Sequence, residues 1–272
     1  MQCFTVSPLP GTQVKMDVCL RSKVYEHVDH SRRPCVLIFP GGGYTHLSPR
    51  EAEPIAVAFV QAGYQACVLH YSVRPSQDAP ALGDTPLQEA AAAVRYIREH
   101  SEDWGIDPNK ITVCGFSAGG HLAGCLGVLG SNEGRIPGAS DGKCQPNAMI
   151  LSYAPAVSEL KASSGSFVNT SGYDSVCPER DPWSIEKHIG PSTCPAFIWH
   201  TTEAPVVPVE NALLLSLALQ KAKIPYDLHI YTKGAHGLSL ANEHVRRSNP
   251  HAATWLPLAL QWLNVMGVGP GY

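Results

Sequence analysis

The 272-residue sequence predicts an α/β fold, a doubly wound and mostly parallel sheet in a single domain that spans residues 1–272. Short apolar runs alternate with helical patterns along the chain, as expected when helices connect parallel strands. The length suffices for one large domain with a buried sheet, and no repeat or low-complexity linker divides it. Ligands of such a sheet bind outside the carboxyl ends of its strands.

The expected elements follow from local patterns. The continuous apolar run at residues 35–40 is typical of a strand buried on both faces. Apolar side chains recur at helical spacing in residues 51–62, and Gly63 ends that helix. In chain order the expected strands are residues 16–20 and 23–26 (an opening antiparallel hairpin), 35–40, 64–71, 110–114, 148–153, 196–200 and 226–231. The expected helices are residues 51–62, 86–100, 121–129, 209–223 and 252–265.

Residues 156–194 interrupt this alternation. They are polar, contain Ser, Gly and Pro, and show little periodicity. Long irregular segments of compact domains are usually lids or binding loops. We therefore expect a short irregular insertion over the site.

Charge and composition exclude several classes of partner. The formal net charge is −3, and basic residues occur in no run longer than a pair such as Arg246-Arg247. Neither nucleic acid nor an anionic membrane is an expected partner, because both call for a basic surface. No apolar stretch is long enough to span a membrane. Oligomeric state stays open, homo-oligomers included.

The cysteines and the first ten residues favour a cytoplasmic protein. The nine cysteines are scattered without a Cys-x-x-Cys pair, and Cys35, Cys67 and Cys114 lie in apolar strand-like runs. Such cysteines behave as small buried hydrophobes, so reduced thiols are expected. Residues 1–10 lack the pattern of a secretory signal. A secreted mature form from which a signal was removed is the alternative.

The most informative segment is Cys114 to Gly120, which reads Gly-x-Ser-x-Gly between an apolar strand and an Ala/Leu/Gly helix pattern. This order is the nucleophile elbow of an α/β-hydrolase, in which Ser117 sits on a sharp turn. A serine hydroxyl is inert near neutral pH and needs a base to take its proton. Ser117 is therefore the predicted nucleophile.

His236 is the predicted base. It follows the last expected strand by a few residues, in Lys233-Gly234-Ala235-His236-Gly237, where the order nucleophile, acid, histidine places the base in this fold. His121 is closer to Ser117 in sequence, but it lies on the helix after the elbow and should not face the nucleophile. We interpret His121 as structural.

Two backbone N–H groups should form an oxyanion hole. One is expected from Ala118, the residue after the nucleophile, and the other from Gly42 or Gly43 in the glycine loop that follows the strand at residues 35–40. Glycines suit this loop because the backbone itself must approach the substrate.

Together these motifs resemble the acetylxylan-esterase and feruloyl-esterase branch of the α/β-hydrolases, the bacterial BD-FAE group of carbohydrate esterases. The matching stretches are Phe39 to Tyr44, Arg50 to Pro54, Trp104 to Pro108, Gly115 to Ala123, Trp199 to Thr201 with Val207 to Asn211, and Gly234 to Leu238. The resemblance implies removal of acetyl or feruloyl groups from sugar hydroxyls without a metal or another cofactor. The implied partner is a small acylated carbohydrate.

One position departs from this family. Its motif reads Trp-His-Thr-x-x-Asp-x-x-Val-Pro and supplies the third member of the triad, but Ala204 occupies the aspartate position here. Alanine can neither hold the histidine tautomer nor stabilise the imidazolium. Three interpretations stay open: Glu203 acts as a displaced acid, Ala204 is an introduced substitution that cripples the enzyme, or an acid comes from elsewhere, such as Glu159, or is missing.

The predicted reaction is ester hydrolysis by acyl transfer through Ser117. Tyr44, His46, Trp183 and Leu238 should border the mouth of the site and bind substrate. The acyl group and the sugar are left open by the sequence. Two alternatives remain: a catalytically dead hydrolase that binds an acylated sugar, and a peptidase of the prolyl-oligopeptidase type.

Overall fold

The computed structural model describes residues 1–22, 32–160 and 164–271. Within them, one sheet has the strand order β1-β2-β4-β3-β5-β6-β7-β8. The strands are β1 (Gln2–Val6), β2 (Lys15–Leu20), β3 (Arg33–Phe39), β4 (Gln65–His70), β5 (Ile106–Phe116), β6 (Ala148–Ser152), β7 (Ala196–Thr201) and β8 (Tyr226–Tyr231). Strands β1 and β2 pair antiparallel and β2 pairs antiparallel with β4, whereas β4, β3, β5, β6, β7 and β8 are parallel.

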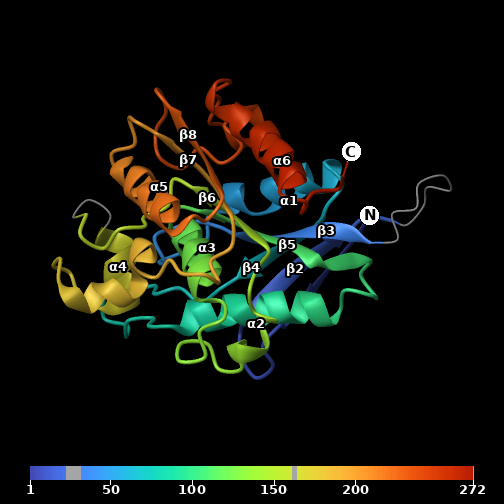
Figure 1. Ribbon diagram of the computed structural model, residues 1–272, viewed down its shortest axis with the longest axis horizontal. Helices are drawn as coiled ribbons and strands as arrows, with labels where there is room; N and C mark the ends of the chain where they lie inside the picture. Colours follow the sequence, from blue (N-terminus) through green and yellow to red (C-terminus); the bar gives the residue numbers. More distant parts are fainter. Residues whose placement is uncertain (23–31, 161–163, 272) are drawn as a thin grey trace.

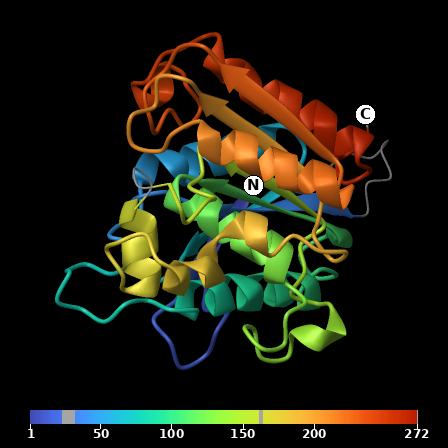
Figure 2. The ribbon, with the colours of Figure 1, turned by 60° about the vertical axis from the view of Figure 1, so that its left-hand side comes forward.

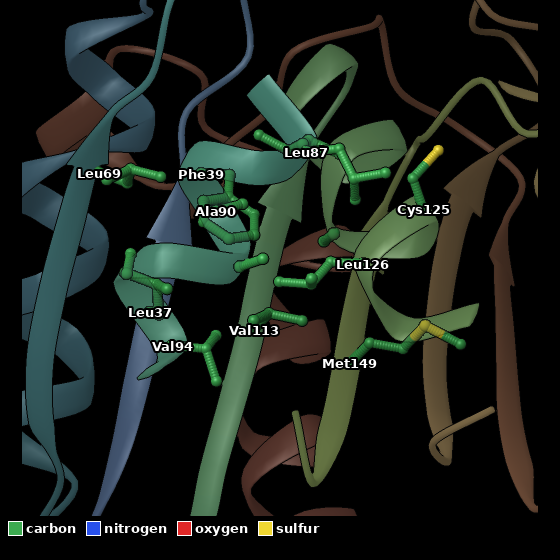
Figure 3. Packing of buried hydrophobic residues seen from close by; sticks show 14 of the residues in the cluster. Leu37, Phe39, Leu69, Leu87, Ala90, Val94, Val113, Cys125, Leu126 and Met149 are labelled. Atoms are coloured by element: carbon green, nitrogen blue, oxygen red, sulfur yellow. The ribbon is translucent and has the colours of Figure 1, made fainter. Parts of the chain in front are cut away.

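Helices cover both faces of the sheet (Figures 1 and 2). The helices are α1 (Glu53–Gln61), α2 (Thr85–Glu99), α3 (Ala118–Leu129), α4 (Ser164–Ser171), α5 (Glu210–Ala222) and α6 (Trp255–Val265). Side chains of α2, α3 and α5 form one core with the sheet, and those of α1 and α6 form the other. Figure 3 shows the first core, where Leu87 and Val94 of α2 and Leu126 of α3 pack on Leu37 of β3 and Val113 of β5. The predicted α/β class with its doubly wound sheet is confirmed.

Some expected elements differ in the structure. Strand β2 pairs with β1 and β4, and residues 23–26, expected as the second strand of the opening hairpin, lie outside the described residues. The helix after the elbow begins at Ala118, not at residue 121. The insertion at 156–194 contains α4 and short 3-10 helices at Pro178–Trp183 and Ile185–Lys187, so it is not irregular throughout, although residues 161–163 are not described.

The three cysteines expected in apolar strands are buried in the structure. Cys35, Cys67 and Cys114 are completely buried in β3, β4 and β5, as small hydrophobic side chains of a parallel sheet. None of the helices in the described ranges is both long enough and apolar enough to cross a membrane.

Candidate active site

Ser117 lies at the tight turn between β5 and α3. Its φ of 53° and ψ of −120° are strained for a residue with a side chain, and its N–H donates to the Ser152 carbonyl at the end of β6 over 2.9 Å. Glycine at position 119 allows the start of α3 to pack closely against β3. A Cβ on Gly119 would lie 2.0 Å from the Phe39 carbonyl oxygen. The elbow therefore holds the serine at the carboxyl end of the sheet, as predicted.

His236 contacts the nucleophile directly. Its Nε2 lies 2.8 Å from Ser117 Oγ, and the Tyr153 ring packs edge-on against the imidazole at a centroid distance of 5.0 Å. Burial lowers the pKa of His236 to about 4, and the charges of His200 and Arg50 act in the same direction. The imidazole is therefore neutral near pH 7 and can accept the serine proton at Nε2.

The other nitrogen of this base has no partner. His236 Nδ1 is buried and makes no hydrogen bond to any residue in the described ranges. Ala204, at the position of the family aspartate, is 7% exposed and follows β7 by three residues. When Ser117 donates to Nε2, Nδ1 must carry the proton, so a buried N–H donor is left unpaired.

The structure does not bring either candidate acid to His236. The side chain of Glu203 is half exposed, and its carboxylate binds Lys233 Nζ at 3.1 Å and the Gly234 N–H at 3.1 Å. The hydrogen bond from Lys233, followed by that from Gly234, lowers the pKa of Glu203. Glu159 is exposed and pairs with Lys187 at 2.9 Å. In the described residues both carboxylates bind partners other than His236, and the identity of the triad acid stays a prediction.

The glycine loop after β3 places backbone donors beside Ser117. A Cβ on Gly42, whose φ is 129°, would lie 2.0 Å from the His46 carbonyl oxygen, so this fold of the loop requires glycine there. In the described part of the chain, the N–H groups of Gly42 and Gly43 have no protein acceptor. The N–H of Ala118 lies in the first turn of α3, where N–H groups lack an intrahelical acceptor. These donors match the predicted oxyanion hole.

A cavity of about 240 Å³ opens on these groups. The glycine loop at residues 41–44 is called the oxyanion loop. The cavity lining includes Ser117, His236, Gly42 and Gly43 of this loop, Ser166 from α4, and Val206 and Val207 after β7. His46 also lines the cavity, as expected. The insertion contributes to the site through Asn169 of α4, whose Nδ2 donates to the Gly43 carbonyl over 2.8 Å.

The other three expected substrate-binding residues do not line this cavity. Tyr44 is 1% exposed because its hydroxyl is hydrogen-bonded to buried His121 Nδ1 at 2.8 Å. Leu238 is 4% exposed within the core between the sheet and α6. Trp183 is part of the insertion, and its carbonyl lies 2.7 Å from His121 Nε2. These contacts confirm the structural interpretation of His121.

Within the described ranges, no group of three or more His, Cys, Asp or Glu side chains is arranged to hold a metal ion. The chemistry that this arrangement supports directly is acyl transfer by a serine with a histidine base and backbone oxyanion donors.

A family model described as BD-FAE matches residues 23–219. The chain belongs to the BD-FAE family. Among curated relatives, an endo-1,4-beta-xylanase B of Butyrivibrio fibrisolvens is 37% identical over 221 residues, which is 80% of this chain and 34% of the relative. An acetylxylan esterase of Xylanibacter ruminicola is 28% identical over 214 residues, 73% of this chain and 39% of the relative. The chain thus spans well under half the length of these two relatives.

Solved structures with the same fold are named as a bifunctional hydrolase and as a carboxylesterase. An acetyl ester-xyloside bifunctional hydrolase of Caldicellulosiruptor lactoaceticus aligns with a TM-score of 0.79 at 31% identity, covering 94% of this chain and 89% of that one. The carboxylesterase Cest-2923 of Lactobacillus plantarum aligns with a TM-score of 0.85 at 25% identity over the whole of both chains. This BD-FAE chain therefore has the α/β-hydrolase fold predicted from its elbow.

Sequence reasoning assigned no role to three groups of this BD-FAE site, although two of them lie in the matching stretch Arg50 to Pro54. Arg50 and Glu51 line the cavity from a short 3-10 helix at Pro49–Glu51, and Tyr153 follows β6. Arg50 Nε donates to the Gly237 carbonyl over 3.0 Å, next to the base. The roles of Arg50, Glu51 and Tyr153 arise from contacts between segments that are distant in sequence, and no local sequence pattern predicts such contacts.

Proposed function

We propose that the chain is a serine ester hydrolase that removes acetyl, or another short acyl group, from a carbohydrate. The observation that carries this proposal is the 2.8 Å contact between Ser117 Oγ and His236 Nε2 beside the N–H donors of Gly42, Gly43 and Ala118. The names of the xylan-related relatives support the carbohydrate part.

The reaction proceeds in two acyl transfers. Ser117 attacks the ester carbonyl while His236 Nε2 takes its proton, and the oxyanion receives hydrogen bonds from Ala118 and from Gly42 or Gly43. The C–O bond to the sugar breaks as His236 returns the proton to the leaving hydroxyl, which leaves acyl-Ser117. Water then attacks the acyl carbonyl while His236 takes its proton. The bond to Ser117 breaks, the proton returns to Ser117 Oγ and the carboxylic acid is released.

The test is acetate release from acetylated xylo-oligosaccharides, measured for this chain and for Ser117→Ala. We expect release that depends on Ser117, together with an unchanged length of the sugar backbone. Acetate release that persists in Ser117→Ala, or cleavage of the backbone instead, would contradict the proposal.

A second candidate function is favoured by the unpaired His236 Nδ1: a protein that binds acylated sugar without turning it over. Loss of the triad acid costs about 10⁴ in kcat in a serine protease while substrate binding persists. Calorimetric binding of an acetylated oligosaccharide, with no acetate released over hours even after Ala204→Asp, would favour this function over the first.

We also propose a cytoplasmic location. Burial of six of the nine cysteines as free thiols supports it, because reduced cysteines persist in reducing compartments. Fractionation of the source cells, followed by detection of the chain in each fraction, tests this location.

A further inference from the structure

A single buried carboxylate joins the loops around Ser117. Glu51 is 1% exposed, and each of its two oxygens accepts a different hydrogen bond. Oε2 accepts the N–H of Gly41, 2.9 Å away, at the start of the oxyanion loop. Oε1 accepts the hydroxyl of Tyr153, 2.8 Å away, in the turn after β6.

Tyr153 extends this connection to the loop that carries the base. Its hydroxyl accepts the N–H of Ser239 over 2.9 Å, three residues after His236. Its ring packs edge-on against the His236 imidazole. Tyr153 and Ser239 both have positive φ, 41° and 54°, which these hydrogen bonds help to maintain. The loops after β3, β6 and β8 thus meet at one carboxylate.

The neighbouring residue makes a second link between the same regions. Arg50 Nε donates to the Gly237 carbonyl, and the Arg50 carbonyl accepts the Ser239 hydroxyl over 2.5 Å. The short 3-10 helix at Pro49–Glu51 therefore contacts the base loop on both sides of Leu238.

We propose that Glu51 is a positioning residue for the ester hydrolysis proposed above, on which this inference rests: its carboxylate fixes the oxyanion loop and the base loop relative to Ser117. This positioning matters in this chain because no acid among the described residues holds His236 through Nδ1. The orientation of the imidazole then depends on Ser117, on the Tyr153 ring and on the anchors of its loop. Glu51 touches no reacting atom and acts through Gly41 and Tyr153.

The chemistry of the site explains why this residue is a carboxylate. The Gly41 N–H and the Tyr153 O–H each need an acceptor, and a carboxylate offers one on each oxygen. An amide of the same shape offers one acceptor and one donor, so Glu51→Gln leaves one of the two donors unpaired. Burial of a charge is costly without such compensation, and it raises the pKa of Glu51.

The test compares Glu51→Gln with Glu89→Gln. Glu89 is a matched control: it is 3% exposed and accepts the N–H and hydroxyl of Ser72 at 2.7 and 2.6 Å, without bonding to Gly41, Tyr153 or the base loop. Both variants lose one buried hydrogen bond, so both should lower Tm. Only Glu51→Gln should lower kcat for 4-nitrophenyl acetate, by about ten- to a hundredfold with KM nearly unchanged.

Two further measurements separate positioning from simple destabilisation. A boronic acid forms a tetrahedral adduct on Ser117, and Glu51→Gln should weaken its inhibition by about the same factor as kcat. Tyr153→Phe keeps the ring against His236 but removes the hydroxyl, which cuts the base loop from Glu51. Its loss of kcat should shrink when Ala204→Asp is present, because the aspartate anchors His236 independently.

Each outcome decides between the two proposals. A kcat for Glu51→Gln equal to that of Glu89→Gln overturns the positioning role and leaves the esterase intact. The positioning role is also overturned if Tyr153→Phe leaves kcat unchanged both in the parent chain and in Ala204→Asp. This second test can still be made if Glu51→Gln fails to fold. Absence of Ser117-dependent hydrolysis in this chain and in Ala204→Asp refutes the esterase itself, and the positioning role with it.

Discussion

Ala204 leaves the base of this site with one hydrogen-bond partner instead of two. In the transition state His236 becomes an imidazolium in a buried place, and burial already lowers its pKa to about 4. An aspartate at 204 would accept the Nδ1–H, hold the reactive tautomer and stabilise the positive charge. A methyl group does none of these. The interpretation that Ala204 lowers activity therefore stays a prediction with a direct physical basis.

Restoring the acid should raise turnover. We expect Ala204→Asp to increase kcat on 4-nitrophenyl acetate by up to about 10⁴, the cost of losing this acid in a serine protease. Glu203→Gln is the control and should change kcat little, since Glu203 binds Lys233 and Gly234 rather than His236. A large loss of kcat in Glu203→Gln with no gain in Ala204→Asp would show that Glu203 is the acid of the triad.

The pH profile should respond to the same residue. The active base is the neutral imidazole, so kcat/KM should be constant above the pKa of His236 and fall as pH drops through about 4. An aspartate at 204 favours the imidazolium and raises that pKa, so the acid limb of Ala204→Asp should move to higher pH. Acid limbs that coincide for the two proteins would contradict an interaction between residues 204 and 236.

The parts of the site that were predictable are those with a local signature. Local backbone requirements, a sharp turn or a close approach to a ligand, predicted the roles of Ser117, Ala118, Gly42 and Gly43. The role of His236 was predicted from its position after the last strand. Glu51 could not be predicted, because its partners are distant in sequence and nothing local marks a carboxylate as buried. The prediction that Tyr44 binds substrate was wrong, because its side chain points into the core. There its hydroxyl is hydrogen-bonded to buried His121, a contact that the local sequence does not reveal.

At the scale of the element, the start of α3 is held against β3 by close backbone contact. A Cβ on Gly119 would lie 2.0 Å from the Phe39 carbonyl oxygen and 2.5 Å from that of Pro40. Backbone cannot yield as a flexible side chain does, so the helix would have to move away from the oxyanion loop. Such a movement changes the distance between Ala118 and Gly42, the two sides of the oxyanion hole.

We therefore expect Gly119→Ala to lower the free energy of unfolding by about 1–3 kcal/mol, the usual cost of overpacking, and to reduce kcat. Urea denaturation and 4-nitrophenyl acetate hydrolysis measure the two effects. Gly190→Ala is the control, since a Cβ there meets nothing within 4 Å and φ is not positive. Equal stability and activity of the two variants would count against the close contact as the reason for glycine.

Element prediction failed where local propensity is weak. Strands β3 to β8 were all expected, and the run at residues 35–40 gives the reason most plainly, since a continuous apolar segment suits a buried parallel strand. Helix α4 was missed because Ser164–Ser171 contains three serines, a glycine and a threonine, which carry little helical preference. Tertiary contacts stabilise it instead, among them the bond from Asn169 to the Gly43 carbonyl. The first strand, β1, lies at the sheet edge and lacks a continuous apolar run.

At the scale of the whole molecule, the alternation of strands and helices was enough to predict the layers. Helices on both faces leave two separate cores, and each must bury side chains from the sheet and from its own helices. Polar groups that end up inside these cores are the exceptions that sequence patterns do not identify. His121 is one of them: it joins Tyr44 of the oxyanion loop to the carbonyl of Trp183 in the insertion.

This buried histidine should make the molecule less stable in mild acid. Burial lowers the pKa of His121 to about 4, so between pH 6.5 and 4 the unfolded chain binds a proton that the folded chain does not. Stability should therefore fall as pH falls through this window, by about 1.4 kcal/mol per pH unit for one such group. Glu51 and Glu89, whose pKa values burial raises, act in the opposite direction, and comparison of variants removes their contribution. Urea denaturation from pH 7 to 4 should give a shallower slope for His121→Gln than for the parent, and an unchanged slope for exposed His244→Gln. A slope for His121→Gln equal to that of the parent would show that His121 is not the group that titrates.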